Sequence, residues 1–270
     1  MSDHATKRNF VEVVGFRVIG GVSYLGGMAI LLSQAISAAP TTLSRSSGRK
    51  ALIGQMDRVG VRSIGVVCLV QIFIGVILAL QLAPPLEPWG QVDKIANIIG
   101  VAGFRMLGPI LTAVVISGFA GASIAAELGT MVVAEEIEAL HAHALNPIRF
   151  LVVPRLIATF IMMLLLTIIA NWMIAVGGYL TSLLVLDPQV GEWYWSLMRD
   201  QLRVRDFASG LIMAGVFGVL ISLIACYEGL RVRGGAEGVG KATTMTVVYS
   251  IISIILAAGI FTTIFYVFGF

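Results

Sequence analysis

The sequence predicts an all-α integral membrane protein, and three observations support that fold class. Hydrophobic residues make up 58% of the 270 positions and charged residues only 12%, about half the charged share of a soluble domain. Five segments are apolar over about 20 residues, the length that a helix needs to cross a bilayer. These segments are continuously apolar and do not alternate with polar residues, which favours helices over strands.

The five predicted transmembrane helices follow one another along the chain. They cover residues 63–83, 106–133, 156–186, 207–227 and 242–270. The third is long enough to be tilted or broken, and Gly177-Gly178 is a plausible place for a break. Residues 18–36 are also apolar but contain four glycines and several polar side chains. An interfacial or re-entrant helix is preferred there to a sixth span.

The distribution of basic residues predicts the orientation in the membrane. With five spans, residues 1–62, 134–155 and 228–241 lie on one side and carry 13 of the 18 lysines and arginines. Because cytoplasmic loops are enriched in these residues, the N-terminus is predicted to be cytoplasmic and the C-terminus external. One membrane domain thus covers 1–270: a cytoplasmic or interfacial segment, 1–62, and a five-span bundle, 63–270. In the last external loop, Trp193, Tyr194 and Trp195 are typical of an interfacial aromatic belt.

A short acidic segment separates the second span from the third. It reads AEEIEALHAHALNPIRF, and Ile137 and Leu140 share one helical face. The segment is too short to span and has no core of its own. It is suited to dock into a groove on another protein, and a solvated connector is the alternative. The residues assigned to it are Glu135, Glu136, Ile137, Glu138, Leu140, Asn146 and Pro147.

Glu127 lies late in the second span, where a carboxylate is costly unless it is paired or hydrated. Glu127 could have a functional role. The alternative is a structural role, in which its carboxylate is solvated at the interface or hydrogen-bonds another helix. Apart from Glu127 and Arg105, the spans place no ionisable group near the apolar interior, which argues against a proton or ion relay. No arrangement of Ser, His, Asp or Cys predicts catalysis.

Two further patterns are interpreted as decoys. Residues 235–241 match the GxxxxGK start of a phosphate-binding loop, but Ala242 replaces the Ser or Thr that holds Mg²⁺, and a membrane helix precedes the segment. His141 and His143 have no third ligand nearby, so no metal site is predicted. The two cysteines lie inside apolar runs and are predicted to be packing residues.

Several segments resemble the MlaE/YrbE permease family, the membrane subunits of ABC transporters that move lipids with Mce-domain partner proteins. The resemblance runs from about Gly54 onward. Its motifs are AAELGTMVVAEEIEALHAHALNPIRFLVVPR at 125–155, GVILALQ at 75–81, LGP at 107–109 and GGAEGVGKATTMTVV at 234–248. Each motif alone is weak, but together they are specific.

The resemblance implies an MlaE-type permease fold with five spans, an N-terminal interfacial helix and a homodimeric assembly. It also implies that residues 134–147 hold the coupling helix that inserts into a separate cytoplasmic ABC ATPase. That partner would bind ATP and Mg²⁺, whereas this chain would need no cofactor and would not be an enzyme. Further implied partners are an Mce-domain substrate-binding protein and membrane lipid, with no nucleic acid. The implied location is the bacterial inner membrane, with the N-terminus in the cytoplasm.

A lipid cavity is predicted where the first span ends and the second begins. Its candidate residues are Leu78, Gln81, Leu82, Arg105 and Met106. Apolar walls would hold acyl chains, at about 0.8 kcal/mol per buried CH₂, and Gln81 or Arg105 would meet the head group. A two-fold axis would double this patch. The alternative is that these residues pack the dimer interface.

The chain departs from the family pattern at four positions. Met106 follows Arg105 where the family often has Glu, Phe119 and Val132 replace common arginines, and Met213 replaces a common lysine. These departures leave the lipid class open, although Met106 suits a less polar head group. Phospholipid is the expected cargo. An ion-coupled secondary transporter, which would show repeated halves with buried charges, and a non-transporting membrane anchor are the alternative functions.

Overall fold

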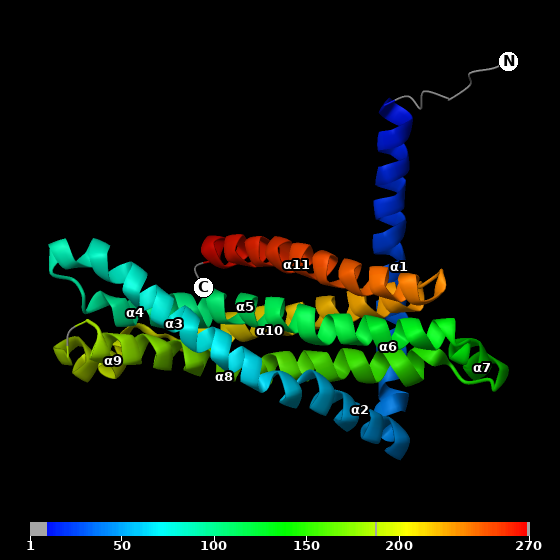
Figure 1. Ribbon diagram of the computed structural model, residues 1–270, viewed down its shortest axis with the longest axis horizontal. Helices are drawn as coiled ribbons and strands as arrows, with labels where there is room; N and C mark the ends of the chain where they lie inside the picture. Colours follow the sequence, from blue (N-terminus) through cyan, green and yellow to red (C-terminus); the bar gives the residue numbers. More distant parts are fainter. Residues whose placement is uncertain (1–9, 187, 269–270) are drawn as a thin grey trace.

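The protein is a bundle of long helices in a computed structural model, which describes residues 10–186 and 188–268 (Figure 1). No strand occurs in those residues. The α-helices in chain order are α1 (Phe10–Ser44), α2 (Ser46–Val59), α3 (Ile64–Leu86), α4 (Lys94–Ala102), α5 (Gly108–Ile116), α6 (Ala122–Val133), α7 (Glu136–Ala142), α8 (Val153–Leu184), α9 (Pro188–Gln201), α10 (Val204–Leu230) and α11 (Gly235–Val267).

Within the described residues, six helical segments are long and apolar enough to cross a membrane. Five of them cover all or most of the predicted spans: α3, the run from α4 to α6, α8, α10 and α11. The chain is therefore a multi-pass α-helical membrane protein, as the composition predicts. The second span begins well before the predicted start, because α4 continues through turns of π-helix into α5 and α6.

The sixth segment is α1, which contains the predicted interfacial stretch 18–36 but is much longer. It is long and apolar enough to span, and few of its side chains are buried. Figure 1 shows α1 running across the bundle, whereas α3, α8, α10 and α11 extend along its long axis. That direction favours the interfacial interpretation, because a helix lying across the spanning helices lies along the membrane plane.

Helix α8 forms the centre of the bundle and is continuous from Val153 to Leu184. Of the two alternatives for this long span, a break at Gly177-Gly178 is therefore excluded. A Cβ at Gly177 would overlap the backbone carbonyl of Ile72 on α3, and one at Gly75 would overlap that of Ile174 on α8. Glycines at these places let the two helix backbones come into contact. Their role is close packing, not a break.

The buried core lies where α6, α8 and α10 meet, with α1, α3 and α11 around them. Its largest fully buried side chains include Phe217, Met213, Leu166 and Leu128. Gly229 on α10 lies against Ala125 on α6, so closely that a Cβ there would meet the backbone of α6. Small residues thus set the helix spacing in a bilayer, where lipid supplies no hydrophobic drive for association.

The connections gather at two opposite ends of the bundle (Figure 1). Helix α7 and the corner between α1 and α2 lie at one end, called here the α7 end. Helix α9 and the start of α4 lie at the other, called here the α9 end. The predicted loop that carries Trp193 and Trp195 is helical and forms α9. The two tryptophans are exposed as an aromatic belt requires, but Tyr194 is fully buried, and burial raises the pKa of its phenol.

Candidate functional site

Helix α7 projects from its end of the bundle between two left-handed residues (Figure 1). Glu135 precedes it with a φ of 59°, and Ala144 follows it with a φ of 55°. Residues other than glycine rarely adopt this conformation, and it persists only where the surroundings impose it. The chain therefore leaves α6 and returns toward α8 through two sharp turns, which set α7 apart as a short helix of its own.

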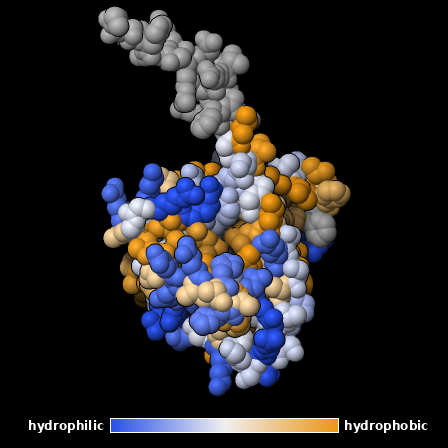
Figure 2. Space-filling model, turned by 90° about the vertical axis from the view of Figure 1, so that its right-hand side faces the viewer, coloured by the Kyte–Doolittle hydropathy of each residue, from blue (hydrophilic) through white to orange (hydrophobic). Residues whose placement is uncertain are grey.

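The two faces of α7 differ as the amphipathic pattern predicts. Ile137 and Leu140 are half-buried, whereas Glu136 and Glu138 are exposed. Packing of α7 is mainly against α6. Figure 2 looks onto this end of the molecule, where hydrophilic side chains gather in front of apolar ones. The acidic face is thus free to meet another molecule.

Asn146 and Pro147 begin the helix that returns into the bundle. The side-chain oxygen of Asn146 accepts a hydrogen bond from the backbone N–H of Ile148 at 3.0 Å. Pro147 is buried at the entry to a π-helical turn, Ile148–Val152, which leads into α8. Within the predicted segment 134–147, α7 occupies the middle, and these two residues cap the following helix.

Glu127 is held by two arginines from two other helices. Its Oε1 lies 2.7 Å from Nη1 of Arg58 on α2, and its Oε2 lies 3.0 Å from Nη2 of Arg155 on α8. The side chain of Arg155 is only 4% exposed and also donates to the backbone carbonyl of Leu151 at 2.7 Å. These bonds tie α2, α6 and α8 together one and a half turns before α6 ends, and so support the structural interpretation of Glu127.

An open pocket of about 570 Å³ lies beside this ion-paired group. Its walls are mixed: Arg58 and Arg62 come from the α2 side, Phe119 from a π-helical turn and Thr130 from α6. Phe119 gives this pocket an aromatic wall in addition to the two basic side chains.

At the α9 end, Arg105 and Met106 lie in a π-helical turn, Gly103–Leu107. Such turns often occur at functional sites. Nη1 of Arg105 lies 3.6 Å from Oδ1 of Asp206 on α10, and Met106 is 39% exposed. Both line an open pocket of about 540 Å³ between α4 and the end of α9. Its lining is Asn97, Ile98, Val101, Ala102, Arg105, Met106, Leu107 and Gln201.

The other predicted cavity residues lie on α3 and are not among the residues that line this pocket. Leu78 and Leu82 pack against a small buried cluster that includes Ile95, Ile99 and Ile174. Gln81 is exposed. The structure therefore brings Arg105 and Met106 together in one pocket, and the three α3 residues do not line it. Their joint role in one cavity stays a prediction.

The glycine-rich segment 235–241 forms the first two turns of α11. It follows α10, and a phosphate-binding loop needs a preceding strand. His141 and His143 are exposed. Within residues 10–186 and 188–268, no three His, Cys, Asp or Glu side chains form a group that could hold a metal ion.

The sequence did not identify the ion-pair partners of Glu127 and Arg105. Arg58 and Arg155 counted only as cytoplasmic charges, and Asp206 was not singled out. A buried polar contact in the bundle, from Nε2 of Gln71 to Oγ1 of Thr112 at 3.0 Å, was also missed. The available signal was the position of polar residues inside or at the ends of apolar runs, since such residues need partners.

Comparison with known proteins assigns the family. Residues 52–264 match the family Permease MlaE. A probable ABC transporter permease protein of Rickettsia felis is 36% identical over 261 residues, covering 96% of this chain and 98% of that protein. The intermembrane phospholipid transport system permease protein MlaE of Haemophilus influenzae is 31% identical over 245 residues, covering 90% and 92%. The chloroplast protein TRIGALACTOSYLDIACYLGLYCEROL 1 of Arabidopsis thaliana is 34% identical over 215 residues, covering 78% and 60%.

Proposed function

The chain belongs to the MlaE permease family, and we propose that it is the membrane subunit of an ABC transporter that moves phospholipids. The observation that carries the proposal is α7, an exposed acidic helix between two spans, with Glu136 and Glu138 turned away from the bundle. The names of the relatives in Rickettsia felis and Haemophilus influenzae support the same function.

In this proposal α7 is the coupling helix, and a cytoplasmic ABC ATPase binds ATP and Mg²⁺ and holds α7 in a groove. Movement of the ATPase shifts α7 and the end of α6. Because Glu127 on α6 pairs with Arg58 and Arg155, the shift passes to α2 and α8. Interfaces with two discrete arrangements can amplify such small displacements into opening or closing of a cavity.

The pocket around Met106 supports a lipid-handling role for the α9 end. A mostly apolar wall accommodates acyl chains, and Arg105 offers a charged group for the head group. In a homodimer this pocket occurs twice, and the exposed residues of α3, including Gln81, complete the proposed cavity. An Mce-domain protein outside the membrane exchanges lipid with this end.

The proposed topology has five crossings and an interfacial α1, in the bacterial inner membrane. It rests on the direction of α1 in Figure 1 and on the excess of basic residues in segments at the α7 end. The α7 end is then cytoplasmic, where an ATPase can reach it, and the N-terminus lies on the same side.

Charge reversal on α7 tests the coupling role. The double variant Glu136→Lys/Glu138→Lys should lower co-purification of the ATPase and ATP-driven lipid transfer by about tenfold or more, because close like charges at an interface cost several kcal/mol. The matched control is Glu192→Lys on α9, an exposed carboxylate at the opposite end. It should leave ATPase binding unchanged.

Both variants should insert into the membrane at the level of the parent chain, since all three carboxylates are exposed. Normal ATPase binding and normal transfer in the α7 double variant would disprove the coupling role. Equal loss in the α9 control would show that the effect does not belong to α7.

A further inference from the structure

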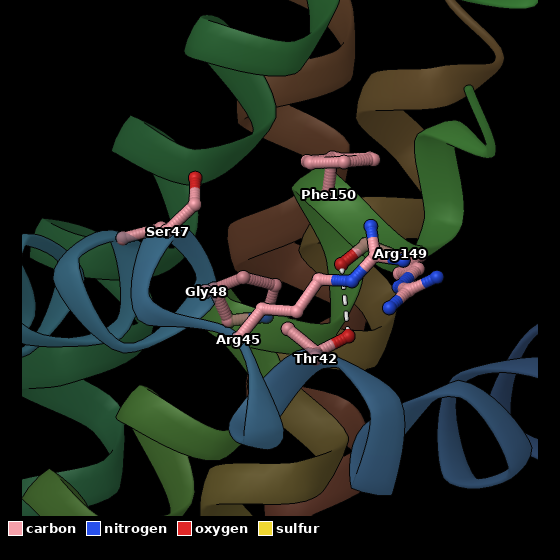
Figure 3. Close-up of a pocket in the computed structure, with 8 residues that line it drawn as sticks. Thr42, Arg45, Ser47, Gly48, Arg149 and Phe150 are labelled. Carbon is pink, nitrogen blue, oxygen red and sulfur yellow. Dashed lines mark hydrogen bonds between the residues drawn. The ribbon is translucent and has the colours of Figure 1, made fainter.

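A small pocket lies at the corner where α1 passes into α2, against the turn that leads into α8 (Figure 3). Its volume is about 40 Å³, room for a few water-sized groups. Its lining is Thr42, Arg45, Ser47, Gly48, Ala51, Arg149, Phe150 and Pro154. The pocket is separate from those beside Glu127 and Met106. Anion binding there does not depend on the proposed function, whereas the choice of the cytoplasmic leaflet rests on the proposed topology.

Two arginines from distant parts of the chain line this pocket. Figure 3 shows Arg45 reaching across it toward Arg149. Arg149 donates one hydrogen bond, from Nη2 to the backbone carbonyl of Thr41 at 2.9 Å. Among the described residues the side chain of Arg45 has no hydrogen bond or ion pair, and no acidic side chain lines the pocket. Two like charges therefore face one space without a counter-charge, and an anion there would relieve their repulsion.

The corner is held in place without such an anion. The hydroxyl of Thr42 donates to the carbonyl of Ala38 at 3.0 Å and lies 3.4 Å from the carbonyl of Arg149. Gly48 approaches the carbonyl of Thr42 so closely that a Cβ would overlap it. The pocket is therefore preformed, so a ligand would not have to order the backbone around it.

The position of the pocket indicates the source of the anion. It lies at the α7 end, at the corner between α1 and α2. Both helices carry exposed apolar side chains, among them Ile36 on α1 and Ile53 on α2. Basic residues at the end of a membrane bundle meet the anionic head groups of the cytoplasmic leaflet. Ala51, Phe150 and Pro154 add an apolar wall, which suits the glycerol and first methylene groups of a lipid better than a hydrated free ion.

We propose that this pocket binds the phosphate group of an anionic phospholipid from the cytoplasmic leaflet. Arg45 and Arg149 contact its oxygens, since guanidinium groups form strong charge-assisted hydrogen bonds to phosphate. The pocket admits the phosphate and leaves the acyl chains outside, against α1 and α2. The bound lipid pins the corner between α1 and α2 to the start of α8.

Native mass spectrometry of the full chain in detergent, titrated with phosphatidylglycerol, tests this site. The variant Arg45→Gln should weaken binding of the tightest lipid by about tenfold, the effect of losing one hydrogen bond between charged groups. The matched control is Arg49→Gln, an exposed arginine one turn along α2 that does not line the pocket. It should change binding by less than about twofold.

A second variant, Ala51→Leu, fills the pocket without changing any charge and should weaken binding as much as Arg45→Gln. Equal weakening by Arg45→Gln and Arg49→Gln, or unchanged binding in Ala51→Leu, would overturn the site. Inorganic phosphate at millimolar concentration should not displace the lipid. Displacement by phosphate would assign the pocket to a free ion and overturn the lipid assignment.

Discussion

The two ends of the bundle each contain an ion pair between helices, but the two pairs are built differently. At the α7 end, both oxygens of Glu127 are bound, at 2.7 and 3.0 Å, and its partner Arg155 is almost completely buried. At the α9 end, Arg105 and Asp206 are 3.6 Å apart, with side chains 32% and 11% exposed. The group at the α7 end has shorter contacts and joins three helices, whereas the α9-end pair is a single, longer contact, so we expect the first to cost more to break.

The difference fits two tasks. A rigid connection among α2, α6 and α8 transmits a displacement of α7, because tightly bonded helices move together. A looser contact beside an open pocket lets the pocket walls move when lipid enters or leaves. In the proposed transporter, the first end receives force from the ATPase and the second end handles lipid.

The largest expected effect is a difference in thiol labelling between the two ends, which shows which end faces the cytoplasm. In spheroplasts, and with Cys68 replaced by Ser, a cysteine at Ser196 on α9 should react with a membrane-impermeant thiol reagent, because that position is exposed at the α9 end. A cysteine at Arg233, after α10, should not react until the membrane is permeabilised. The reverse pattern would exchange the proposed roles of the two ends.

The next effect is on stability at the α7 end. Glu127→Gln keeps the shape of the side chain but leaves Arg155 buried without a counter-charge, which should lower the free energy of unfolding by about 3 kcal/mol. Arg58→Gln removes the other partner, whose side chain is 55% exposed, and should cost less than about 1 kcal/mol. Equilibrium unfolding in detergent measures both. Equal losses of unfolding free energy in Glu127→Gln and Arg58→Gln would show that the buried Arg155 does not dominate the contribution of this ion-paired group.

A smaller, several-fold effect is expected for lipid contact at the α9 end. A photo-crosslinking residue at Met106, which lines the pocket, should capture lipid in a manner that changes when ATP is added with the ATPase. The same probe at Leu165, an exposed position on α8, should capture bilayer lipid independently of ATP. A probe at Leu78 decides whether the α3 surface belongs to the same cavity. Identical ATP-independent capture at Met106 and Leu165 would place the cavity elsewhere.

The smallest effect is on stability at the α9 end. Asp206→Asn removes the charge but can still accept the hydrogen bond from the backbone N–H of Arg203, which Asp206 now accepts at 3.1 Å. It should therefore cost less than about 1 kcal/mol. Asp206→Ala also removes the helix cap and should cost about 1 kcal/mol more. A cost for Asp206→Asn as large as that of Glu127→Gln would remove the contrast between the two ends.

Local patterns in the sequence predicted most of the fold and one part of the candidate site. The long apolar helices, the acidic amphipathic helix and the family follow from apolar runs and short motifs, because a bilayer demands continuous apolar length and satisfied backbone groups. The sequence left a break at Gly177-Gly178 open, since a pair of glycines permits a kink and close packing equally. Which of these occurs depends on whether another backbone lies against them, and here α3 does.

By itself the sequence determined that this chain is a multi-pass α-helical membrane protein of the MlaE permease family, with an acidic helix between two spans. Only the tertiary structure decided that Glu127 is bound to Arg58 and Arg155, that Arg105 pairs with Asp206, and that Arg45 and Arg149 share a pocket. The physical reason is sequence separation. Composition and periodicity act within one helix, whereas ion pairs and pockets depend on which helices pack together and in which register.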